Sequence, residues 1–127
     1  MSNEELNILN AKKNSDDFGI PNLARNCNEA LILAILEKGR KHGYQIALEI
    51  EEKSEGTFRF NHGTLYPILH KLEKNGLIRG RWQNEGPKRK RKYYTLTSKG
   101  KRYLRAQADE WRNFFHHFFL IVGDQKQ

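Results

Sequence analysis

Side chains that can bind nucleic acid gather around the segment HGTLYPILHKLEKNGLI, residues 62–78. Leu65, Leu69 and Leu72 recur there at helical spacing, which predicts an amphipathic helix with a polar outer face. Amide and imidazole groups on such a face can hydrogen-bond to base edges, and hydroxyl groups can bind phosphate oxygens. The candidates for these contacts are Asn61, His62, Thr64, Tyr66 and His70.

Individual roles within this polar face have two interpretations. In the first, Asn61 and His62 reach base edges, while the hydroxyl groups of Thr64 and Tyr66 bind phosphates. In the second, Thr64 only caps the helix and Tyr66 packs on the preceding helix. Lys71 is expected to contact phosphate in the first interpretation.

Pro67 lies inside this predicted helix, although proline has no N–H to donate to the preceding turn. If Thr64 caps the helix, Pro67 falls in the first turn, where that N–H would have no partner. If Asn61 caps it instead, Pro67 lies deeper and must loosen or kink the turn. In both cases the proline stiffens the end of the helix that carries the polar candidates.

Positive charge is concentrated in the second half of the chain. The formal net charge is +8, yet residues 1–60 hold 8 basic and 10 acidic residues, against 15 and 5 in residues 61–127. A basic run follows a Gly-Pro turn: Lys88, Arg89, Lys90, Arg91 and Lys92. We expect this run to contact the DNA backbone, with Arg89 or Arg91 entering a narrow minor groove. The alternatives are a solvated charge run, or strand-supporting roles for Arg91 and Lys92.

The order of the predicted elements suggests how these residues are positioned. Helices are predicted after Asn22 and over 42–56 and 62–75, followed by a hairpin of two short strands around the basic run, and a last helix from Ser98. The fold class is therefore mainly α, a winged helix-turn-helix, in which the third helix enters the major groove. We divide the chain into a flexible arm (1–21), a DNA-binding domain (22–97), a dimerisation helix (98–122) and a tail (123–127).

Two apolar surfaces predict a second copy of the chain. The segment ALILAIL, residues 30–36, is apolar on nearly every side, which one small domain can hardly cover. The last helix carries an apolar seam at heptad spacing, which predicts a homodimer through Leu104, Trp111, Phe114, Phe118 and Ile121. In the second helix, Tyr44 and Leu48 are expected to pack inward.

Three strings of the sequence resemble the PadR family of bacterial transcription regulators: HGTLYPILHKLEKNGLI, GPKRKRKYYTLTSKG and ALILAILEKGRKHGYQI. The single short C-terminal helix is similar to that of the smaller PadR subgroup. The resemblance implies homodimers, often repressors, that leave a pseudo-palindromic operator when a small molecule or another signal arrives. The wing, PKRKRK, is more basic than the usual tip of the family.

The resemblance also implies a ligand site, because some small PadR-like multidrug sensors hold flat aromatic molecules between two tryptophans. Trp111, with Phe114 and Phe115, occupies the matching part of the last helix. A planar aromatic effector is one expectation. A seam filled by the phenylalanine side chains is the other.

Other classes of function receive little support from the sequence. It shows no paired carboxylates, no nucleophile–base set and no glycine-rich phosphate loop, so we expect neither an enzyme nor a cofactor or metal. Neither a signal peptide nor a membrane-spanning run is recognisable, so we expect a cytoplasmic bacterial protein with no membrane partner. The competing hypothesis is a sequence-tolerant nucleic-acid-binding protein that depends on the basic run alone.

Overall fold

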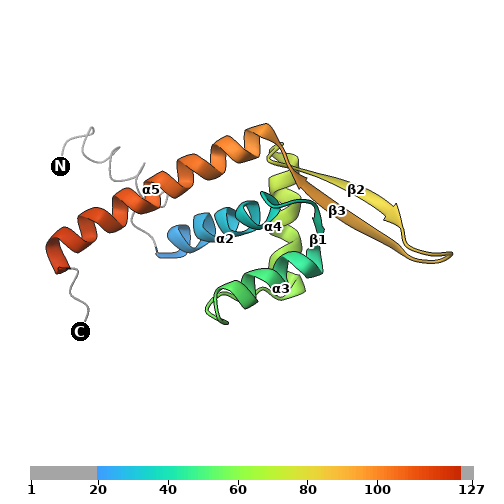
Figure 1. Cartoon of the computed structure of the whole chain (residues 1–127), viewed down its shortest axis with the longest axis horizontal. Coiled ribbons are helices and arrows are strands. Elements are labelled where there is room, and N and C mark those ends of the chain that lie inside the picture. The colour runs from blue at the N-terminus through green and yellow to red at the C-terminus, as the bar shows by residue number, and fades with distance from the viewer. Residues whose placement is uncertain (1–19, 124–127) are drawn as a thin grey trace, which may run out of the picture.

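A computed structural model describes residues 20–123 and places four helices around a small sheet (Figure 1). The elements in chain order are α2 (Ile20–Leu36), β1 (Lys41–His42), α3 (Gly43–Lys53), α4 (His62–Lys74), β2 (Ile78–Asn84), β3 (Lys90–Leu96) and α5 (Ser98–Val122). The predicted winged helix-turn-helix is confirmed. Most of the predicted arm and tail, 1–19 and 124–127, lies outside the described residues. The arm prediction is wrong for residues 20 and 21, which belong to α2.

The wing is a long antiparallel hairpin of β2 and β3, and its base is joined to the body by β1. Gly80 pairs with Tyr94 and Trp82 with Lys92, so these four residues share one face of the ribbon. β1 was not predicted, because residue 42 was assigned to the second helix. His42 is instead the N-cap of α3, in a reciprocal pair of hydrogen bonds with Gln45.

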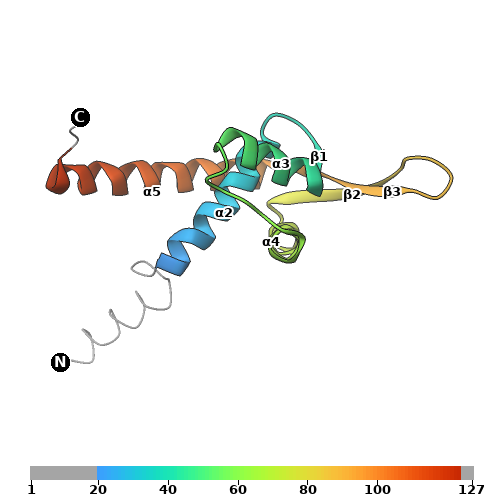
Figure 2. The ribbon, with the colours of Figure 1, turned by 90° about the horizontal axis from the view of Figure 1, so that it is seen from below.

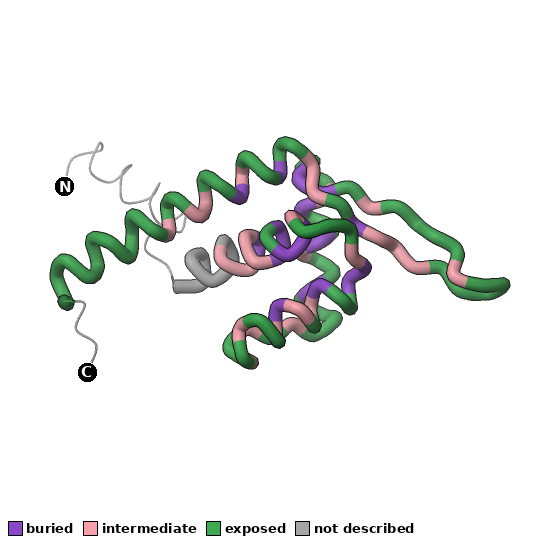
Figure 3. Tube along the Cα trace, viewed as in Figure 1, coloured by how far each residue is buried: buried purple, intermediate pink, exposed green. Residues whose placement is uncertain are grey.

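The core surrounds α2, whose Ile32, Leu33, Ile35 and Leu36 are all buried within one chain (Figure 3). These four side chains are covered within one chain by α3, α5 and β3, whereas Leu31 is half-buried and Ala34 is exposed, so cover of this helix by a second copy stays a prediction. Tyr44 and Leu48 of α3, expected inside, are 61% and 40% exposed.

A buried carboxylate joins three helices of this core. Glu29 of α2 is 5% exposed, and its Oε1 lies 3.1 Å from Lys71 Nζ of α4. The hydroxyl group of Tyr103, on α5, donates a hydrogen bond of 3.1 Å to Glu29 Oε2. Burial, together with Glu29, raises the pKa of Tyr103 to about 12, so the phenol stays protonated as a donor.

Helix α5 has two parts with different surroundings. Its first turns pack on the body, where Leu104 is 4% exposed, and its second half projects beyond the other elements (Figure 2). Leu104, predicted for the dimer seam, therefore belongs to the core of the single chain. Trp111 is half-buried, whereas Phe114, Phe118 and Ile121 are exposed.

Two helical glycines should respond to alanine with opposite signs. A Cβ at Gly100 would lie 2.0 Å from the Leu77 carbonyl oxygen, whereas a Cβ at Gly63 would meet only Asn61 Oδ1 at 3.4 Å. We expect Gly100→Ala to lower the free energy of unfolding by about 2 kcal/mol despite its better helix propensity. Gly63→Ala should raise it by about 0.5 kcal/mol. Urea titrations at one protein concentration measure both changes; stabilisation by Gly100→Ala would contradict this packing.

Candidate nucleic-acid interface

Asn61 is the N-cap of the proposed recognition helix α4. Its side chain accepts a hydrogen bond of 2.9 Å from the Thr64 N–H, so the alternative with Thr64 as the cap is wrong. Pro67 consequently lies inside the helix, where its missing N–H leaves the Gly63 carbonyl without the usual partner four residues on. The affected turn is on the exposed side of α4.

The polar face of α4 is exposed, as predicted. Asn61, His62, Thr64, Tyr66 and His70 all lie at the surface. The opposite face carries the buried leucines of the core.

The rings of His62 and Tyr66 stack with centroids 5.7 Å apart, so both belong to one patch. The Tyr66 ring also lies against Gly43 of α3, since a Cβ built on Gly43 would be 3.1 Å from the hydroxyl oxygen of Tyr66. Both interpretations of Tyr66 thus have support, since it packs on α3 and remains 46% exposed.

The basic side chains divide into two groups. Lys71, which was expected to contact phosphate, instead forms an ion pair with Glu29 inside the chain. Arg91 Nε lies 3.6 Å from Glu85 Oε2, and Lys92 Nζ lies 2.8 Å from Glu73 Oε1. Lys88, Arg89 and Lys90, at the tip of the wing, are exposed and form no ion pair with another described residue. Within the basic run, the charge without an ion pair to a described residue is therefore at the tip, whereas Arg91 pairs within the hairpin and Lys92 pairs with α4.

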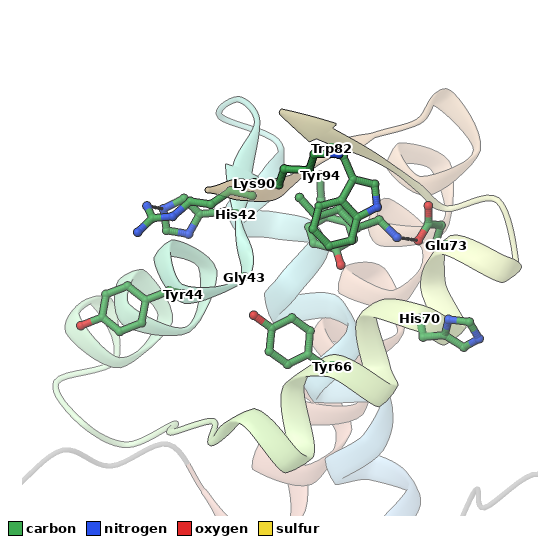
Figure 4. A pocket seen from close by; sticks show the side chains of 11 residues that line it. His42, Gly43, Tyr44, Tyr66, His70, Glu73, Trp82, Lys90 and Tyr94 are labelled. Carbon is green, nitrogen blue, oxygen red and sulfur yellow. Dashed lines mark hydrogen bonds and ion pairs between the residues drawn. The ribbon is translucent and has the colours of Figure 1, made fainter. Parts of the chain in front are cut away.

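A hollow of about 420 Å³ separates α4 from the wing (Figure 4). Tyr66 and His70 line it from α4, Trp82 and Tyr94 from the wing, and Gly43 from the start of α3. Burial raises the pKa of Tyr94 to about 12, with smaller contributions from Glu73 and Tyr66. The outer face of α4 and the inner face of the wing therefore border one space.

Two residues of this hollow were missed as site candidates. Trp82 is 67% exposed and lies on the face of the ribbon opposite Arg79 and Arg81, which borders the hollow. Glu73 binds the wing across the hollow, and the Lys92 ammonium holds the pKa of its carboxyl below the usual value. No local sequence signal could have paired Glu73 with a residue on the second strand of the hairpin.

Comparison with known proteins decides the family. A family model described as the transcriptional regulator PadR-like family matches residues 32–106, which include α4 and the whole wing. The chain belongs to this family. The negative transcriptional regulator PadR of Bacillus subtilis is 38% identical over 73 residues, which cover 58% of this chain and 40% of PadR. The chain thus spans less than half the length of that relative.

Solved structures agree with this assignment. A transcriptional regulator from Clostridium thermocellum matches 79% of the chain and 97% of its own length, with 29% identity and a TM-score of 0.73. Bacillus subtilis PadR in complex with operator DNA matches 63% of the chain and 44% of its own, with 35% identity and a TM-score of 0.59. These PadR-like proteins are transcription regulators, not enzymes. Within residues 20–123, no helix has the length and apolar character needed to span a bilayer.

His42 makes the fold sensitive to acid. It is buried; its Nδ1 accepts the Gln45 N–H at 3.3 Å and its Nε2 lies 2.9 Å from Arg91 Nη1. Burial, with a further contribution from Arg91, lowers its pKa. The unfolded chain therefore takes up this proton first, so the stabilisation is complete above the unfolded pKa of about 6.5 and is lost as pH falls.

We expect the free energy of unfolding of the wild type to decrease between about pH 7.5 and pH 5. His42→Asn keeps a side chain that caps helices well but does not titrate. Its loss over the same interval should be smaller, as measured by urea unfolding at both pH values. A carboxylate such as Glu49, whose lowered pKa comes from Lys53 and Lys41 and not from His42, contributes equally to both proteins, so equal losses would exclude His42 as the cause.

Proposed function

We propose that this chain is a dimeric, sequence-specific DNA-binding transcription regulator of the bacterial cytoplasm, in which α4 occupies the major groove. The observation that carries the proposal is the shared border of the hollow: Tyr66 and His70 of α4 face it together with Lys90 of the wing. One strand of a duplex can then meet both elements. Bacillus subtilis PadR, in a structure with operator DNA, supports this proposal for the matched part of the chain.

The exposed residues have distinct roles in this proposal. Asn61 and His62, at the start of α4, contact base edges, as the first turn of a recognition helix does. Thr64 and Tyr66 bind phosphate oxygens through their hydroxyl groups. The wing tip, Lys88 to Lys90, follows the backbone, with Arg89 placed for the minor groove.

The projecting half of α5 supports a homodimer. Its exposed apolar side chains are Phe114, Phe115, Phe118, Phe119, Leu120, Ile121 and Val122. A continuous apolar face of this kind is typical of an interface. We propose that a second copy covers it and that Trp111, Phe114, Phe118 and Ile121 form the seam. Two-fold symmetry then places the two α4 helices on half-sites related by a pseudo-palindrome.

Repression is the regulatory effect we propose, since the relative from Bacillus subtilis is a negative regulator. Occupation of an operator would then block transcription, and an effector would release the protein. The competing proposal, a sequence-tolerant nucleic-acid-binding protein, is supported by the unpaired cations of the wing tip, which would attract any duplex.

Selection of binding sites from a random duplex pool at near-physiological salt separates the two proposals. We expect enrichment of a palindromic motif with half-sites about one helical turn apart. Sedimentation of the same protein should give the mass of a dimer. Retention of the pool without enrichment would favour the sequence-tolerant protein and contradict the assignment of base contacts to α4.

We also propose that a planar aromatic molecule is the effector and binds beside Trp111. The ring of Trp111 stacks on Phe115 with centroids 5.5 Å apart, and Phe114 meets it edge-on at 6.2 Å. Across a two-fold axis this cluster would face its copy, and offset stacking suits a flat guest.

In a Trp82→Phe protein the remaining tryptophan is Trp111. We expect a planar cationic dye to quench its fluorescence in a saturable manner. Ile121→Glu, which puts a charge on the exposed seam, should give monomers and abolish the saturable quenching. No quenching at high dye concentration would indicate that the phenylalanine side chains fill the seam.

A further inference from the structure

Two polar groups of the wing meet at Glu73 on α4, which lines the hollow. Its Oε1 accepts an ion-paired hydrogen bond from Lys92 Nζ at 2.8 Å, marked by the dashed line in Figure 4. Its Oε2 accepts the backbone N–H of Gly80 at 3.2 Å. One carboxylate therefore binds both strands, at positions two residues apart in the register of the ribbon. We call Glu73, Gly80 and Lys92 the wing clamp.

The surroundings of the clamp leave little freedom. Lys92 Nζ lies 5.5 Å from the centre of the Tyr94 ring and 5.9 Å from that of Trp82, so its ammonium group is enclosed by two aromatic faces and a carboxylate. At Gly80 there is no room for a side chain, because a Cβ would lie 2.3 Å from Lys92 Cε and 2.9 Å from Glu73 Oε2.

Other contacts also attach the hairpin to the body, since Ile78 of β2 and Tyr94 of β3 are buried in the core and Arg91 Nη1 lies 2.9 Å from His42 Nε2. β1 contributes two residues that pair with Tyr93 and Tyr94, and these fasten only β3. The guanidinium of Arg40 lies 4.6 Å from the centre of the Tyr93 ring, on the opposite face of the ribbon. Glu73 is the side chain of α4 that hydrogen-bonds to both strands, so it links α4 directly to the wing.

The clamp also changes the charge presented to DNA. A lysine in this hollow could bind a phosphate of any sequence, but Glu73 neutralises it. An acidic group beside the groove-facing surface further repels phosphates that come too close.

We propose that Glu73 is a specificity-determining positioning residue, which acts by fixing the wing relative to α4 and by keeping Lys92 away from phosphate. Sequence-independent affinity is thereby reduced, and tight binding requires that α4 and the wing fit their grooves together. This inference rests on the proposed function, because it concerns operator recognition, yet Glu73 itself contacts no base in it.

The test compares Glu73→Gln with Glu52→Gln, a control with the same change in net charge at an exposed position of α3. Affinities for the selected operator and for a random duplex are measured at several salt concentrations. In Glu73→Gln the released Lys92 should bind random DNA more tightly and steepen the salt dependence by about 0.9, the value for one phosphate contact. The ratio of operator to random affinity should fall about tenfold, as for one mismatched base pair.

A double variant, Glu73→Gln with Lys92→Gln, separates position from charge. Its random affinity and salt dependence should return close to those of the wild type, while the ratio stays low because the clamp is still broken. If Glu73→Gln does not fold, Lys92→Gln breaks the same clamp from the wing and should also lower the ratio. Glu52→Gln should leave the ratio unchanged.

Three results would overturn the proposal. One is a ratio in Glu73→Gln within about twofold of the wild type. Another is a double variant that recovers the full ratio, which would leave charge alone as the cause. The third is an equal loss of both affinities in Glu73→Gln. A wild type that does not prefer its operator over random DNA would instead overturn the proposed function together with this inference.

Discussion

A buried carboxylate, Glu29, links three helices of this molecule. A carboxylate away from water needs partners, and the two that Glu29 finds lie on different helices, α4 and α5. Leucines on the inner face of α4 supply most of the apolar contact and decide which face of that helix is exposed, but apolar contacts have no fixed direction. The contacts of Glu29 with Lys71 and Tyr103 add directed links between α2, α4 and α5.

The distribution of exposed positive charge likewise depends on which basic side chains form ion pairs. Three cations of this region that lie close to the body pair with an acidic side chain: Lys71 with Glu29, Arg91 with Glu85, and Lys92 with Glu73. Within the basic run, the residues of the wing tip, Lys88 to Lys90, extend into water and form no ion pair with another described residue. The basic run is uniform in the sequence, but its charge is not evenly available in the structure. It is compensated by ion pairs where the run lies near the body, and it remains positive at the wing tip.

Local patterns were enough to predict much of this structure. The spacing of Leu65, Leu69 and Leu72 identified α4 and its outer face, and the two short strands around the basic run identified the wing. What failed depended on contacts between distant residues. Leu104 fits the heptad series as well as Phe118 does, and only the packing of α5 on the body separates them. The apolar surroundings of α2 and the partner of Glu73 likewise depend on how elements assemble, which no single segment encodes.

Because α5 both enters the core at Leu104 and carries the proposed seam, in the proposed dimer it would be a rigid spacer between the body and the symmetry axis. Its 25 residues span about 37 Å without a break. One residue inserted between these two parts would turn the body about the helix axis by about 100° relative to its partner. Such a change would misalign the two recognition helices on a duplex, even with every DNA-contacting side chain intact. The length of this helix is consequently constrained to steps of about seven residues, which restore the phase of the seam.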